Sequence, residues 1–227
     1  MNDRYFDHLT NSTADIGDIH VRAAAARITN VHRAILAAIA ANIGDRDLTP
    51  TGKQKKGRDE LKQKAPDLVK INALVQRLAA RTDEKRAAVQ LPAIDKTDTA
   101  GAVLRGQVRD RLAGKSPQEL RALIPTMSAL YLQTILEAPE LIGADRETVD
   151  AARARVIDVV RPGMSAELER ERVAVNLLVN AAAALSTDAR ELADLPTANA
   201  LDAFIAEAVP NPSGIVAEIA RDTAIAA

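Results

Sequence analysis

The chain has 227 residues, a formal net charge of −1 and an aromatic content of 2%, and it contains neither cysteine nor tryptophan. The lack of cysteine excludes a disulfide scaffold, thiolate chemistry and cysteine-ligated zinc. The near-neutral charge argues against a globally basic nucleic-acid-binding protein. A core drawn from Ala, Leu, Ile and Val suits closely packed helices better than a sandwich or a barrel.

Two long helices are predicted first along the chain. Apolar residues recur at three- and four-residue spacing from Asp15 to Ile43, which predicts an amphipathic helix that ends at Gly44. A second helix is predicted from Pro50 to Ala88, with two seven-residue seams typical of a helical hairpin or short coiled coil and a kink or restart at Pro66. The residues that we expect at the helix interface, as contact surfaces in assembly, are Ile28, Val31, Ile35, Leu68, Ile71 and Val75.

The stretch "QLPAIDKTD" (residues 90–98) is the strongest boundary signal in the chain, because Pro92 ends a helix and the residues after it can cap the next one. We therefore predict an N-terminal helical hairpin or coiled-coil-like region at residues 1–90. A C-terminal helical bundle is predicted at residues 91–227.

Shorter helices are predicted beyond this boundary. One opens with the capping box "SPQE" (residues 116–119), and a longer one runs from Ser165 to Leu185. In the longer helix, Asn176 and Asn180 either set the register of a buried interface or face solvent. No stretch has the pattern of a strand. The predicted fold class is all-α: a long N-terminal helical hairpin followed by a bundle of shorter helices.

Residues 53–64 concentrate positive charge where the second helix starts, although cations there oppose the helix dipole by a few tenths of a kcal/mol each. Two interpretations stay open, a well-solvated helix end or a surface for an anionic partner. The segment has no aromatic residue, so any nucleic-acid contact would be with phosphates and independent of sequence. The candidate anionic-partner-binding residues are Lys53, Lys55, Lys56, Arg58, Lys62 and Lys64.

The mainly acidic residues 187–227 contrast with this basic segment. This polarity either orients the molecule between unlike neighbours or arises by chance.

No motif predicts catalysis or ligand chemistry. The stretch "GKQKKGRD" (residues 52–59) has the glycine spacing of a phosphate loop but lacks its Lys-Ser/Thr pair. The histidines His8, His20 and His32 form no His-x-x-x-His pair. We therefore expect no enzyme activity, no catalytic residue, no metal ligand and no cofactor. The apolar stretches are shorter than the ~20 residues of a membrane-spanning helix, so we expect no membrane contact.

The segments "LTPTGKQKKGRDELKQKAPDLV" (residues 48–69), "LPAIDKTDTAGAVLRGQVRDRL" (91–112) and "ILEAPELIG" (135–143) resemble small helical proteins of alphaproteobacterial phages and prophages, encoded near particle-assembly genes. The resemblance covers about residues 48–143. It implies a phage context and a virion component, and it supplies no catalytic residues.

We therefore expect a non-enzymatic bacteriophage structural protein, a virion component of the head, its interior or the head–tail region. It would assemble through helix-mediated contacts with other phage structural proteins and as a homo-oligomer or part of a symmetric assembly. The virion, built in the host cytoplasm, is its expected location. The alternative is a DNA-packaging or nucleic-acid-binding accessory protein that contacts phosphates through the 53–64 basic segment.

Overall fold

The computed structural model describes residues 3–89, 91, 93–95 and 97–223. This part of the chain holds ten α-helices and two short 3-10 helices, and it contains no strand. The protein is all-α, as predicted. Its contacts divide it into two compact units: unit 1 combines the residues up to Thr82 with those from Arg170 on, and unit 2 comprises Asp83–Glu169.

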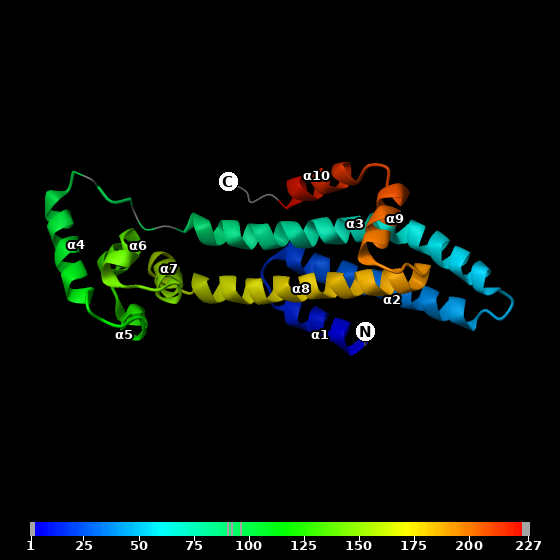
Figure 1. Cartoon of the computed structure of the whole chain (residues 1–227), viewed down its shortest axis with the longest axis horizontal. Helices are drawn as coiled ribbons and strands as arrows, with labels where there is room; N and C mark the ends of the chain where they lie inside the picture. Colours follow the sequence, from blue (N-terminus) through cyan, green and yellow to red (C-terminus); the bar gives the residue numbers. More distant parts are fainter. Residues whose placement is uncertain (1–2, 90, 92, 96, 224–227) are drawn as a thin grey trace. The chain divides into compact units, whose positions relative to one another are not determined.

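The helices of unit 1 come from both ends of the chain, and two of them extend into unit 2 (Figure 1). In chain order they are α1 (Asp3–Ala14), α2 (Ile19–Gly44), α3 (Pro50–Ala88), α8 (Met164–Ala193), α9 (Ala198–Ala208) and α10 (Pro212–Asp222).

Helices α2 and α3 run antiparallel in unit 1. At one end, the N-cap of α2, Asp18, pairs with Arg81 of α3, with Nη1 and Oδ2 3.1 Å apart. At the other end, Nδ2 of Asn42 in α2 donates to the carbonyl oxygen of Lys53 in α3 at 3.2 Å.

Helix α8 also packs antiparallel to α3. The hydroxyl of Thr82 donates to Oε1 of Glu171 at 3.3 Å. Glu171 lies near the point where α8 enters unit 1. At the opposite end, Nε of Arg58 donates to the carbonyl oxygen of Ala193 at 3.4 Å. Unit 1 is therefore built on three long helices, of which α3 runs opposite to α2 and α8.

A single apolar core joins these three helices, and α1 packs on α2. Helix α8 supplies a continuous inward face at three- and four-residue spacing, as a helix buried on one side requires. This face consists of Ala174, Val175, Leu178, Ala181, Ala182, Leu185 and Ala189. Phe6 and Leu9 of α1 and Leu201 of α9 belong to the same core.

The observed units have different bounds from the predicted regions 1–90 and 91–227, because residues 170–227 belong with the N-terminal helices. Capping and proline signals mark where a helix ends, but they do not reveal which distant helix its apolar face contacts. Helix α3 has the predicted bounds, and it continues through Pro66, so no restart occurs there.

Unit 2 is a set of short helices with its own core, which includes Val108, Leu112, Leu120, Leu132, Ile135 and Val156. Its complete elements are α4 (Thr99–Leu112), α5 (Pro117–Leu123), η1 (Ile124–Thr126), α6 (Ala129–Glu137), η2 (Pro139–Ile142) and α7 (Arg146–Val160).

Side-chain caps fix the starts of α4, α5 and α7 in unit 2. The predicted capping box is confirmed at α5, where Glu119 accepts from the Ser116 backbone N–H and hydroxyl, both at 2.8 Å, and these bonds lower the pKa of Glu119. At α7, Asp145 accepts from the Thr148 hydroxyl at 2.6 Å, from Arg121 at 2.7 Å and from the Thr148 backbone N–H at 2.8 Å. These bonds lower the pKa of Asp145 to about 2.

Candidate functional site

Two lysines of the basic segment make contacts with other residues of the same chain. Nζ of Lys53 donates to the carbonyl oxygen of Ile43 in the last turn of α2 at 3.0 Å. Lys56 pairs with Asp45, the C-cap of α2, with Nζ and Oδ2 3.2 Å apart, and this bond lowers the pKa of Asp45. A cation is favourable at a helix C-terminus, so the antiparallel neighbour α2 offsets the unfavourable position of these lysines at the start of α3.

The C-terminal end of α8 meets the same part of α3. Arg58 donates to the carbonyl oxygen of Ala193, and Nε2 of Gln54 donates to Oδ2 of Asp194 at 3.1 Å. The basic segment thus lies beside Asp194, one of the acidic residues of the 187–227 region.

The remaining cations have a different placement. Lys55 and Lys62 are exposed, Arg58 is exposed despite its bond to α8, and Lys64 is half-buried. Lys55, Arg58 and Lys62 are three and four residues apart, so they share one outward face of α3. This outward basic stripe, Lys55, Arg58 and Lys62, is what the segment presents to solvent.

Gly57 lies at a close approach between α3 and α8. It is buried, and a Cβ placed on it would overlap the carbonyl oxygen of Leu192 and lie 3.2 Å from Nδ2 of Asn42. Only glycine leaves room for the last turn of α8 at this distance. Gly57, one of the two glycines whose spacing resembles a phosphate loop, therefore serves helix packing.

Helix α8 ends at this junction in a Schellman arrangement. The N–H of Leu195 bonds to the carbonyl oxygen of Arg190 at 3.0 Å, and the N–H of Asp194 to that of Glu191 at 3.3 Å. Asp194 takes the left-handed position, with φ of 52°, that glycine usually fills. This turn directs the chain away from α8 and holds the Asp194 carboxylate beside Gln54.

A cavity of about 390 Å³ lies where the ends of α2, α3 and α8 meet. Its apolar part comes from Ile39, Ile43, Pro50 and Leu192, and its polar part from Asn42, Lys53, Gln54, Glu191 and Asp194. This junction cavity gathers residues more than 130 positions apart in the sequence, so no local motif could have indicated it.

The six predicted helix-interface residues all lie in the core of unit 1. Ile28, Val31 and Ile35 of α2 and Leu68, Ile71 and Val75 of α3 are each at most 7% exposed. They form a helix interface, but the helices belong to the same chain. The expectation that they contact another subunit does not fit this placement, because α8 supplies the partner surface that the sequence left unidentified.

The outer face of α8 has a different character. Val173 and Val179 are 52% and 43% exposed, and Asn176, Asn180 and Ala183 are exposed on the same side. No charged residue occurs between Arg172 and Asp188. The uncharged outer face of α8, defined by these five residues, is therefore about 16 Å of exposed helix without a formal charge.

A buried polar pair lies in the core of unit 1. Nδ1 of His32 is 3.0 Å from Oδ2 of Asp188, and both residues are at most 5% exposed. The ring of Phe6 stacks on the imidazole with centroids 3.7 Å apart and planes inclined by 17°. The pair links α2 to α8 under a cover from α1, a helix that the sequence pattern did not predict.

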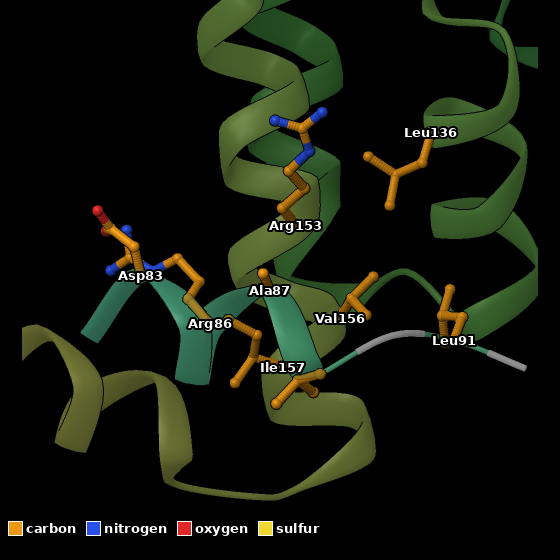
Figure 2. A pocket seen from close by; sticks show the side chains of 9 residues that line it. Asp83, Arg86, Ala87, Leu91, Leu136, Arg153, Val156 and Ile157 are labelled. Carbon is orange, nitrogen blue, oxygen red and sulfur yellow. The ribbon is translucent and has the colours of Figure 1, made fainter. Parts of the chain in front are cut away.

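Unit 2 has its own cavity, of about 450 Å³, whose walls come from the end of α3, the residues after it, α6 and α7 (Figure 2). Its wall residues are mainly apolar: Ala87, Val89, Leu91, Leu136, Val156 and Ile157. The arginines that line it are engaged, Arg86 with Glu169 and Arg153 with Asp150, each pair 3.6 Å apart. Apart from the Asp83 carboxylate, the cavity therefore offers apolar contact and little to orient a polar ligand.

Comparisons with known proteins add no relative: no family model, no curated protein and no solved structure matches the chain. In the described part of the structure, no group of three or more His, Cys, Asp or Glu residues is placed to hold a metal ion. None of the described helices has the length and apolarity needed to cross a bilayer.

Proposed function

We propose that this protein is a non-enzymatic structural component of a bacteriophage particle that assembles through helix–helix contacts between copies of the chain. The observation that carries the proposal is the uncharged outer face of α8. The phage context rests on the sequence resemblance at residues 48–143, and the contact surface rests on the structure.

The outer face of α8 has the composition of the centre of a protein interface. Charged residues are depleted at such centres, and here two exposed valines lie on a helix face without a charge over about three turns. Asn176 and Asn180 lie four residues apart, and an amide both donates and accepts hydrogen bonds. The same amides can therefore pair with their own copies across a twofold axis, which makes a second copy the best-matched partner.

Light scattering on the purified protein tests this assignment. We expect a defined oligomer whose mass is the same at low and at high salt, because the contact contains no charge. Val179→Lys should produce a monomer of unchanged helicity. The matched control is Val103→Lys in unit 2, where the valine is 59% exposed, and it should leave the oligomer intact. A monomeric wild-type protein, or two variants with equal effect, would contradict the proposal.

The outward basic stripe favours a second candidate function, a DNA-packaging or nucleic-acid-binding accessory role. Phosphate contacts by Lys55, Arg58 and Lys62 would give an affinity for DNA that falls steeply with salt. Lys55→Glu and Lys62→Glu are the informative variants, since both lysines are exposed. Charge reversal at Lys53 or Lys56 would disturb contacts with the end of α2 as well. DNA binding that is unchanged in the double variant would reject this candidate.

A further inference from the structure

The junction cavity contains a buried acceptor without a donor. Asn42 is 8% exposed, and its Oδ1 is buried with no hydrogen-bond partner. The orientation of the amide follows from its other bond: the carbonyl of Lys53 can only accept, so the NH₂ group must face it and Oδ1 must lie on the other side. A buried acceptor left without a donor costs about 1–3 kcal/mol, so a site that keeps one is matched to a ligand with N–H or O–H groups.

The charges around the cavity indicate the sign of the charge on that ligand. Glu191 lines the cavity, is exposed, and its carboxylate has no hydrogen-bond or ion-pair partner among the described residues. The Asp194 carboxylate accepts from Gln54, which is neutral. The one cation in the lining, Lys53, donates to the end of α2. The cavity lining therefore carries two carboxylates and one ammonium group, which is already hydrogen-bonded, so its net charge is negative.

The apolar part of the cavity indicates the shape of the ligand. Ile43 is 71% exposed although it belongs to this wall, and Ile39, Pro50 and Leu192 continue the same apolar surface. A cavity of about 390 Å³ lies at the lower end of the range for small-ligand sites. A short alkyl chain would cover Ile43 while its charged end reaches the acceptors.

We propose that the junction cavity binds an alkylguanidinium or alkylammonium group, held by Oδ1 of Asn42 and the carboxylates of Glu191 and Asp194. The group has two possible sources, a free amine or the side chain of an arginine or lysine on a protein partner. Both present N–H donors at the end of an apolar chain. The site is separate from the outer face of α8, so the oligomer test does not decide it.

Calorimetric titration of the full-length protein with n-butylguanidinium tests the proposal. We expect saturable binding at one site, and much weaker binding of n-butanol and pentanoate, which share the apolar chain but lack the positive charge. Glu191→Gln should weaken binding about tenfold, as expected for the loss of a charge-assisted hydrogen bond. Asn42→Leu should weaken it about fivefold by removing a neutral acceptor of similar size.

The control variant is Glu207→Gln, in which an exposed carboxylate of α9 outside the cavity is neutralised, and it should bind as the wild type does. Circular dichroism on each variant establishes that the helices are retained. Titration with N-acetyl-arginine methylamide then separates the sources: tighter binding than n-butylguanidinium indicates a protein side chain, and weaker binding a free amine. Absence of saturable binding by n-butylguanidinium, equal binding of n-butanol, or equal effects of Glu191→Gln and Glu207→Gln would overturn the proposal.

Discussion

Replacing Gly57 by alanine should destabilise unit 1, although alanine is the better helix former. The added Cβ would overlap the carbonyl oxygen of Leu192 and lie 3.0 Å from its carbonyl carbon, well inside the separation of about 3.5–4.0 Å at which carbon atoms attract. Because the obstacle is backbone, it cannot turn aside, and the last turn of α8 must move. Forced overpacking of this kind costs about 1–3 kcal/mol.

Two further terms enter the estimate. Movement of α8 would weaken the hydrogen bond from Arg58 to Ala193, worth about 1 kcal/mol, whereas the higher helix propensity of alanine returns about 1 kcal/mol. We expect a net loss of about 2 kcal/mol, which for a chain of this length lowers Tm by about 4–8 °C.

Thermal and urea unfolding followed by circular dichroism measure the effect, and amide hydrogen exchange along α3 and α8 locates it in unit 1. The control is Gly106→Ala in α4, where an added Cβ meets nothing within 4 Å and helix propensity alone should raise stability by up to about 1 kcal/mol. If Gly57→Ala were as stable as the wild type, or more stable, the close approach of α3 and α8 would be refuted.

Three further sets of variants probe electrostatic contacts. Asp145→Ala should lower Tm at neutral pH. Because the folded-state pKa of Asp145, about 2, lies below the usual value near 3.9, the difference in Tm between the variant and the wild type should shrink as the pH falls from about 4 to 2. A difference in Tm that does not change with pH would contradict this. Asp188→Ala leaves the imidazole of His32 buried without its carboxylate and should cost about 3 kcal/mol in chemical denaturation, whereas replacing both residues by leucine should recover much of the loss. Lys53→Glu should cost about 1 kcal/mol at the end of α2, and Lys62→Glu, at an exposed position, should change the free energy of unfolding by less than about 0.5 kcal/mol.

The sequence predicted the helices well because their signals are local. The start of α3 at Pro50 and the capping box at Ser116 both follow from residues within a few positions of each helix end. Helix α1 was missed, since its apolar residues are few and its contribution, Phe6 stacked on His32, depends on a distant partner.

The candidate sites were much harder to predict from the sequence. The lysines of the basic segment were identified as a conflict with the helix dipole, but its resolution by the end of α2 required the antiparallel placement of the two helices. The tight contact at Gly57 is with α8, which follows more than 100 residues later, and the orphaned oxygen of Asn42 belongs to a cavity that α8 helps to line. The absence of charge on the outer face of α8 is, by contrast, a local property of the chain, because residues 173–187 contain no Asp, Glu, Lys or Arg.

The division of unit 1 between the two ends of the chain has a consequence for biosynthesis. Helices α2 and α3 leave the ribosome with their apolar faces complete, but the matching face of α8 lies beyond the 87 residues of unit 2, Asp83–Glu169. At about 5–20 residues per second, that interval lasts roughly 4–17 s. Unit 2 is continuous in sequence and can fold as soon as it has been made, whereas the core of unit 1 must stay open to water until the last quarter of the protein, from Arg170 on, arrives. Nascent chains stopped before Arg170 should therefore bind chaperones that recognise exposed apolar helices.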